Sequence, residues 1–290
     1  MIVVHPPETT LRAPRLSAPP GSTDCHFHIF GPESRYPYVA ERRFTPPDVS
    51  TDDFERVCRQ LGIERGVLVQ PSGYGFDNAR LLDAAAAMTL PTRLVVVLPL
   101  DAPDAEWQRH HDAGARGLRM IATQPGGLGL DELERAGARM AELGWNIQLL
   151  VNPEQLLAAE ERLARLPCPV VIDHMAHCPA AGGVGQAPFQ ALLRLLRGGR
   201  AWVKLSAGYH LSKEPPPYAD LLPLVHALVE ARPDRLVWAS DWPHVTMTNM
   251  KLDSTALFDL LLDWVPDEAL RRDVLVRNPE ALYGFPAAAA

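Results

Sequence analysis

The 290-residue sequence has few cysteines, no excess of basic residues and no apolar run long enough to cross a membrane. Its four cysteines form no CxxC pair, so we expect reduced thiols and a cytoplasmic protein rather than a disulfide framework. The net charge of −7 and the lack of a basic run argue against nucleic acid as a partner. Residues 1–21 lack the pattern of a signal peptide, and no membrane partner is expected.

The sequence also lacks a Gly-x-Gly-x-x-Gly motif after any predicted strand, which weakens a dinucleotide-binding hypothesis. A hydrophobic content of 47% and a charged content of 22% are ordinary for a globular protein. The proline-rich residues 1–20 predict a leading arm that lies along the surface. We assign residues 21–290 to a single domain.

Short apolar runs alternate with helical patterns along that domain. Strands are predicted at residues 24–30, 67–69, 94–98, 117–121, 147–151, 170–173, 202–206 and 236–240. Because the runs are continuously apolar, the strands should be buried on both faces, as in a parallel sheet. Eight strand-helix units in series predict a (β/α)8 barrel, with a doubly wound open sheet as the alternative.

Two histidines, His26 and His28, stand two residues apart at the end of the first predicted strand. Side chains at this spacing share one face, so the two imidazoles should project together while Cys25 and Phe27 face the other way. Each imidazole needs a polar partner when buried. The pair is therefore either structural or part of a site.

Two more polar residues end other predicted strands. His174 follows the sixth apolar run, and Asp241 follows the eighth. In a barrel the carboxyl ends of the strands meet at one face, where active sites lie. We therefore predict one catalytic site made of His26, His28, His174 and Asp241.

Further residues are candidates for binding a substrate at this face. Arg119 lies in the fourth predicted strand with Arg116 just before it, and Ser206 ends the seventh. The long loop at residues 31–50 carries aromatic residues, including Phe44, and is predicted to cover the mouth. The substrate-binding candidates are Arg116, Arg119, Phe44, His177, His210 and Ser206.

Three histidines and an aspartate support two kinds of hydrolysis. A divalent metal held by His26, His28, His174 and Asp241 could activate water. Alternatively, without a metal, the imidazoles could polarise a carbonyl oxygen while Asp241 takes a proton from water. The spacing alone does not separate a metal-free site from a site with one zinc ion.

Four segments of the chain resemble the amidohydrolase superfamily. They are residues 24–32 (DCHFHIFGP), 171–175 (VIDHM), 238–244 (WASDWPH) and 278–285 (NPEALYGF). The resemblance spans roughly residues 20 to 285. It is strongest to the branch of 2-pyrone-4,6-dicarboxylate lactonases and sugar-lactone hydrolases and isomerases, and it implies a distorted barrel.

The resemblance implies roles for individual residues. In the lactonase branch, the positions of His26, His28 and His174 polarise the lactone carbonyl without a metal, and that of Asp241 activates water. Arg116 matches a substrate-binding arginine. No lysine stands on the fourth or fifth strand, where many members carry a metal-bridging lysine, so a binuclear centre is not expected.

The arginines and tyrosines that clamp the dicarboxylate in that branch are not all kept. Histidines stand at 177 and 210, and Phe44 and Leu150 replace tyrosines. Histidine cannot replace the bidentate fork of arginine, so we expect a less charged lactone as the substrate. The alternatives are a mononuclear zinc decarboxylase or amide hydrolase, a lactone isomerase and a non-catalytic ligand-binding barrel. A homo-oligomer is possible in each case.

Overall fold

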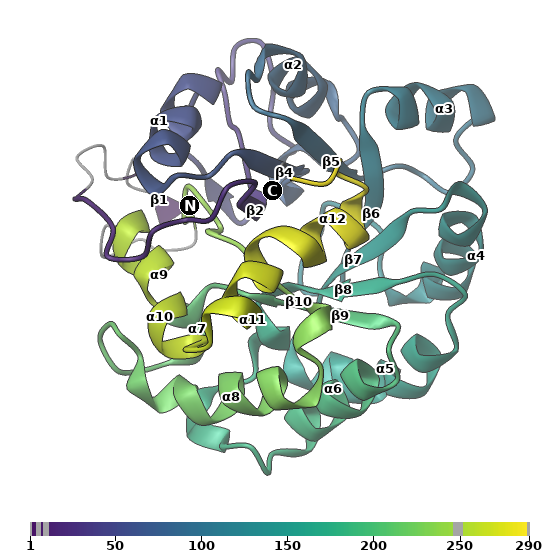
Figure 1. The fold of residues 1–290 in the computed structure, drawn as a ribbon. Coiled ribbons are helices and arrows are strands. Elements are labelled where there is room, and N and C mark those ends of the chain that lie inside the picture. The colour runs from purple at the N-terminus through teal and green to yellow at the C-terminus, as the bar shows by residue number, and fades with distance from the viewer. Residues whose placement is uncertain (1, 4–6, 8–11, 246–251, 289–290) are drawn as a thin grey trace.

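The computed structural model describes residues 2–3, 7, 12–245 and 252–288. Its centre is a sheet of eight parallel strands in the order β10-β9-β8-β7-β6-β5-β4-β2. The strands are β2 (Thr23–Phe27), β4 (Arg65–Val69), β5 (Thr92–Val96), β6 (Ala115–Ile121), β7 (Asn146–Leu150), β8 (Val170–Ile172), β9 (Ala201–Leu205) and β10 (Leu236–Trp238). The sheet curls into a nearly closed barrel (Figure 1), which confirms the predicted fold class.

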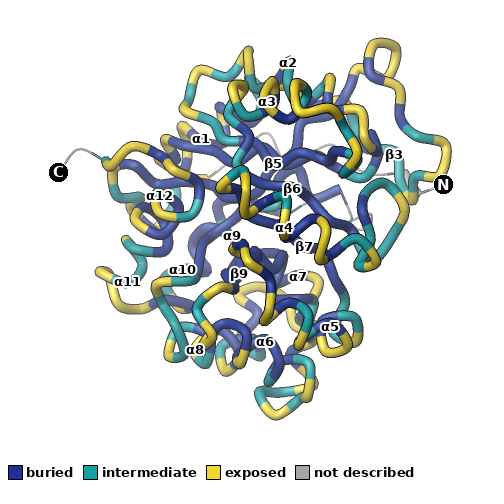
Figure 2. The backbone as a smooth tube through the Cα atoms, turned by 90° about the vertical axis from the view of Figure 1, so that its right-hand side faces the viewer, coloured by how far each residue is buried: buried dark blue, intermediate teal, exposed yellow. Residues whose placement is uncertain are grey.

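Helices alternate with these strands and surround them. They are α1 (Thr51–Leu61), α2 (Ala79–Ala87), α3 (Asp104–Asp112), α4 (Leu133–Leu143), α5 (Pro153–Arg165), α6 (Ala187–Arg197), α7 (Gly208–Leu211), α8 (Leu222–Ala231), α9 (Ser254–Asp259), α10 (Leu261–Trp264), α11 (Glu268–Arg272) and α12 (Asn278–Tyr283). Capping boxes at Ser50 and Asn152 start α1 and α5 by satisfying their first amides. The strands are buried, whereas the helices expose their outer faces (Figure 2).

Two hydrophobic layers hold the barrel together. A small inner cluster fills its amino-terminal half with residues such as Val67, Val171 and Trp202, while a larger cluster lies between strands and helices. Helix α12 lies across the amino-terminal end of the barrel (Figure 1), where Tyr283 and Phe285 join the inner cluster. Because this end is plugged, only the carboxyl ends of the strands can open to a ligand.

The first strand departs from the predicted alternation. The register between β2 and β4 shifts between Asp24 and Phe27, which marks a β-bulge. Cys25 consequently packs in the inner cluster, whereas Phe27 stacks on Phe54 of α1 with ring centroids 3.6 Å apart. The expectation that Cys25 and Phe27 share a face was therefore wrong, because the bulge adds one residue to the inward side.

The barrel closes between β2 and the segment after β10. The carboxylate of Asp24 accepts hydrogen bonds from the backbone amides of His26 (3.1 Å) and Ser240 (3.0 Å), and from the Ser240 hydroxyl. The amide of Asp241 donates to the carbonyl of His26 at 3.0 Å. Closure thus places the first and last strand ends side by side.

The helical segment after β10 is divided at Leu260 into α9 and α10. Part of the predicted arm, residues 1, 4–6 and 8–11, lies outside the described residues. Residues 12–20 contain neither helix nor strand. The assignment of residues 1–20 as an arm separate from the domain stays a prediction.

A single carboxylate fastens the described part of the arm to α9. Asp259 accepts hydrogen bonds from the amides of Arg15 (2.8 Å) and Leu16 (3.0 Å), and its side chain is only 2% exposed. It also forms an ion pair with Arg12 at 2.8 Å. Burial alone would raise the pKa of Asp259, but these contacts hold it below its ordinary value. Among the described helices, none is long and apolar enough to cross a membrane.

We predict that Asp259→Ala lowers the free energy of unfolding by about 2 kcal/mol, because one buried and one partly buried amide lose their acceptor. A depressed pKa stabilises the fold above the unfolded value of about 4, and this contribution is lost as the pH falls through the folded value. The difference from wild type should therefore shrink in acid. Urea unfolding at pH 7 and at about pH 3 measures it, with the exposed Asp263→Ala as control. Equal midpoints for the two variants at pH 7 would contradict the anchoring role.

Candidate active site

The four residues predicted to form the site converge at the carboxyl ends of the strands. The Nε2 atoms of His26 and His28 are 3.1 Å apart. One carboxylate oxygen of Asp241 lies 3.7 Å from Nε2 of His26 and 3.7 Å from Nε2 of His174. Three separate strand ends thus bring three imidazoles and one carboxylate to a single point.

Each of two histidines is oriented by a contact on its other ring nitrogen. Nδ1 of His28 donates to the carbonyl of Val69 at 2.7 Å, and Nδ1 of His174 lies 2.8 Å from the hydroxyl of Ser206. Burial, followed by the charge of Arg119, lowers the pKa of His28 to about 3. Burial also lowers the pKa values of His26 and His174. All three imidazoles are therefore neutral near pH 7.

The two carboxylate oxygens of Asp241 have different surroundings. The hydroxyl of Tyr209 donates to Oδ2 of Asp241 at 2.5 Å, while Oδ1 faces His26 and His174. Burial by itself would raise the pKa of Asp241, but the three histidines and the Tyr209 hydroxyl hold it well below its ordinary value. The side chain is an ionised carboxylate placed to accept a proton.

A second polar layer, which the sequence analysis did not include in the site, lies beneath the histidines. Lys204 is fully buried, with Nζ 2.9 Å from Nδ1 of His26 and 3.2 Å from a carboxylate oxygen of Asp173. The amide nitrogen of Gln148 lies 3.2 Å from the same atom of His26. Alternation along β9 puts Lys204 on the same face as Ser206, but only the folded barrel shows its partners.

The backbone is strained where these groups sit. Among the described residues, eight other than glycine have positive φ, and all of them lie in the connections that follow β8, β9 or β10. They include four consecutive residues, 174–177, with φ between 49° and 54°, and Asp241 with φ 59°. Such conformations cost on the order of 1–3 kcal/mol each and persist at functional sites because the surrounding structure imposes them. The hydrophobic periodicity of the sequence does not predict this strain.

A cavity of about 340 Å³ opens above the four residues. This volume suits a small metabolite. Six predicted residues besides Asp241 line it, together with several that were not predicted. The predicted lining residues are His28, Phe44, Arg119, His174, His177 and His210; the additional ones include Arg43, Ser72, Thr123, Gln124 and Val245. His26 lies directly behind this lining, with no exposed surface.

Two predicted substrate-binding residues lie elsewhere. Arg116 is near the amino-terminal end of β6 and donates to the carbonyls of His111 (3.1 Å) and Ala115, so the structure does not bring it to the cavity. Ser206 is buried against His174 and does not line the cavity. Arg119, three residues after Arg116, reaches the cavity because alternation and the length of the strand carry it to the other end.

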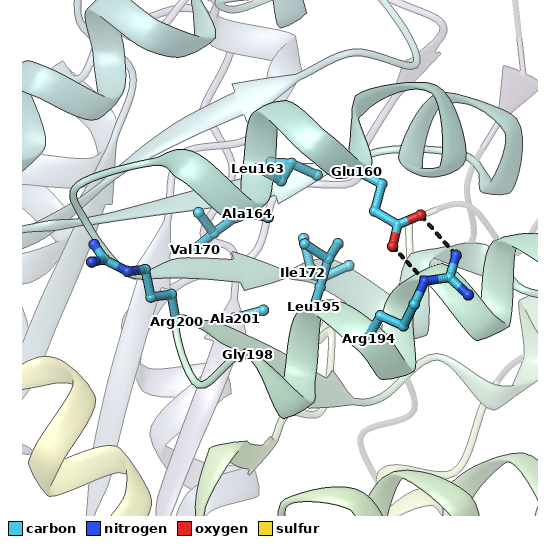
Figure 3. A pocket seen from close by; sticks show the side chains of 10 residues that line it. All are labelled: Glu160, Leu163, Ala164, Val170, Ile172, Arg194, Leu195, Gly198, Arg200 and Ala201. Carbon is cyan, nitrogen blue, oxygen red and sulfur yellow. Dashed lines mark hydrogen bonds and ion pairs between the residues drawn. The ribbon is translucent and has the colours of Figure 1, made fainter.

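Two other cavities have no comparable chemistry. One of about 130 Å³ lies between α5, α6 and the start of β8 and β9 (Figure 3), and its charges include the bidentate ion pair of Arg194 with Glu160. A cleft of about 770 Å³ lies between residues 16–20 and α11. None of its charged lining residues is buried. Of the three, only the cavity above the histidines joins buried acids and bases.

By residue type the site could hold a divalent ion. His26, His28 and Asp241 offer ligand atoms within 4.8 Å of one another, as do His26, Asp173 and His174. Imidazole nitrogens and carboxylate oxygens are the usual ligands of catalytic zinc.

Comparison with known proteins places the chain in a family. Residues 23–285 match the family model described as Amidohydrolase. The chain is 36% identical over 283 residues to a 4-sulfomuconolactone hydrolase of Hydrogenophaga intermedia, which covers 96% of this chain and 93% of that protein. It is 32% identical over 285 residues to a 2-pyrone-4,6-dicarboxylate hydrolase of Comamonas testosteroni, covering 93% and 92%.

A crystal structure of a protein from Agrobacterium tumefaciens in its apo form has the same fold. The two superpose with a TM-score of 0.88 at 28% identity, over 97% of this chain and 100% of the other. The resemblance drawn from the four segments is confirmed by these matches. The chain belongs to the amidohydrolase family.

Proposed function

We propose that the protein is a hydrolase that opens a lactone, a cyclic ester, of a small carboxylated or sugar-derived metabolite. The observation that carries the proposal is the ionised Asp241, whose free oxygen faces the Nε2 atoms of His26 and His174 at 3.7 Å each. Ester hydrolysis needs a base for water and donors for the oxyanion, and this arrangement offers both. Relatives named for lactone hydrolysis support the same activity.

In the proposed reaction the lactone carbonyl lies against the histidines, and water lies beside Oδ1 of Asp241. Asp241 accepts a proton from water as its oxygen attacks the carbonyl carbon. A hydrogen bond from Nε2 of His26 stabilises the tetrahedral oxyanion. The ring C–O bond then breaks, and the proton passes from Asp241 to the departing ring oxygen. Tyr209 keeps Oδ1 turned toward the water by holding Oδ2.

The cavity favours a substrate with one anionic group. Arg119 lines one side, is 5% exposed, and its Nε has no hydrogen-bond partner among the described residues. Arg43 lies on the same side, with one guanidinium nitrogen 2.7 Å from the carbonyl of Thr123. Leu150 and Val245 add apolar surface. We therefore infer a lactone whose carboxylate or sulfonate binds Arg119.

The proposal includes metal independence and a cytoplasmic location. The four cysteines are buried free thiols, as a reducing compartment permits. The partner is a small molecule. A homo-oligomer remains a prediction, as do the substrate-binding roles of Phe44, His177 and His210.

We predict that Asp241→Asn loses at least about a hundredfold in kcat, because general-base assistance is worth that much or more. Chelator-treated wild type should acidify a panel of aromatic and sugar lactones followed with a pH indicator, whereas the variant should not. Asp263→Asn is the surface control. A product of unchanged mass would indicate an isomerase. If no lactone in the panel is hydrolysed and activity on other substrates appears after zinc is added, a zinc decarboxylase or amide hydrolase is favoured.

We predict that Arg119→Met raises KM at least about tenfold for lactones bearing a carboxylate, because a charge-assisted hydrogen bond is lost. KM for a neutral lactone should stay unchanged. Arg116→Met is the matched control, since it makes the same substitution at the other end of the same strand. Equal effects of the two substitutions, or equal effects on both kinds of lactone, would exclude Arg119 from anion binding.

We predict that kcat/KM is independent of pH between about 7 and 8 and that any acidic limb lies below pH 6.5, because burial lowers the pKa of every catalytic histidine. The lowered pKa values of the histidines mean that they become charged only in stronger acid, that of His28 near pH 3. The carboxylate of Asp241 likewise stays ionised through this range. A pH-rate profile with an acidic limb near pH 6.5 would show that a histidine with an ordinary pKa takes part.

A further inference from the structure

The fully buried amine of Lys204 lies against the back of the catalytic cluster. Its Nζ is 2.9 Å from Nδ1 of His26, closer than any other group in contact with that nitrogen. Burial lowers the pKa of Lys204, whereas Asp173 at 3.2 Å favours the charged ammonium. An ammonium has three donors and no acceptor. Nδ1 of His26 must therefore accept this hydrogen bond.

A second donor points at the same nitrogen. The amide nitrogen of Gln148 lies 3.2 Å from Nδ1 of His26, whereas the nearest oxygen of Asp173 is 3.5 Å away. Burial and the charge of Lys204 hold the pKa of His26 well below its usual value, so the ring is neutral and carries one proton. With Nδ1 accepting, that proton sits on Nε2, which faces the catalytic centre.

His28 completes the pattern. Its Nδ1 is 2.7 Å from the carbonyl of Val69, which can only accept, so Nδ1 carries the proton of this neutral ring. Nε2 of His28 is therefore bare and accepts from Nε2 of His26 at 3.1 Å. One directed chain of hydrogen bonds runs from Lys204 through both imidazoles to Val69.

This chain does not fit a metal held by both histidines. Zinc would need a bare Nε2 on each ring, and His26 would then have to carry its proton on Nδ1. In metal sites that second nitrogen donates to a carboxylate or a carbonyl. Asp173 is close enough to serve, but the ammonium of Lys204 lies nearer to the same nitrogen. A proton on Nδ1 would face a positive charge.

We propose that Lys204 is a positioning residue that fixes the Nε2–H tautomer of His26 and thereby opposes zinc binding at the catalytic cluster. The inference rests on the proposed lactone hydrolysis and deepens it, because the Nε2 proton of His26, which His28 accepts in the resting site, is the one that a lactone oxyanion needs. Asp173 balances the charge of Lys204 but does not orient His26.

We predict that Lys204→Met binds zinc about 10- to 100-fold more tightly than the wild type, because Asp173 can then orient His26 as a ligand. Equilibrium dialysis of chelator-treated protein against buffered zinc measures the affinity. The double variant Lys204→Met/His26→Gln should return to the wild-type value. Lys213→Met, the same substitution at an exposed lysine, should change nothing. Equal zinc affinity of wild type and Lys204→Met would overturn the proposal.

The wild-type protein offers a second test that needs no folded Lys204 variant. In protein labelled with 15N-histidine, long-range 1H–15N correlation should show His26 protonated on Nε2 and His28 protonated on Nδ1, with the signals of His26 assigned by their loss in His26→Gln. A proton on Nδ1 of His26 would overturn the proposal. Neither test uses a lactone, so failure of the proposed hydrolysis would be seen separately in the lactone panel.

Discussion

The site depends on the way Asp24 closes the barrel. Its buried carboxylate binds the amide of His26 on one side and both the amide and the hydroxyl of Ser240 on the other. Burial raises the pKa of Asp24 to about 6 even though these hydrogen bonds act against it. Strands β2 and β10 are not neighbours in the hydrogen-bonded order of the sheet. The hydrogen bonds of Asp24 connect the two strand ends instead. His26, which it binds, and Asp241, which follows Ser240, come face to face as a result.

Closure alone would leave several charges in a dry interior, and they are tolerated because they cancel. Lys204 and Arg119 carry positive charge, and Asp173 and Asp241 carry negative charge. Isolated buried ions would cost several kcal/mol each, whereas paired and hydrogen-bonded ones recover most of that loss. With this balance the histidines stay neutral, so their ring nitrogens offer both donors and acceptors to a substrate.

Much of this could be predicted from the sequence, because it follows from short-range pattern. Eight apolar runs predicted the barrel, and polar residues at three strand ends identified the cluster. What could not be predicted depends on register and closure. A bulge turned Cys25 inward, and position along β6 separated Arg116 from Arg119. The role of Lys204 emerged only from its neighbours, because alternation fixes the face of a side chain and not its partners.

The position of Lys204 also supports the proposed polarisation of a carbonyl without a metal. A divalent ion would place its charge in front of the histidines, in contact with the substrate oxygen. Here a single positive charge lies behind them, 2.9 Å from the far nitrogen of His26. In a low-dielectric interior, hydrogen bonds in a chain polarise one another. The hydrogen bond from Lys204 therefore makes the Nε2–H group of His26 a stronger hydrogen-bond donor toward developing negative charge. The front of the site is then left free for water and lactone.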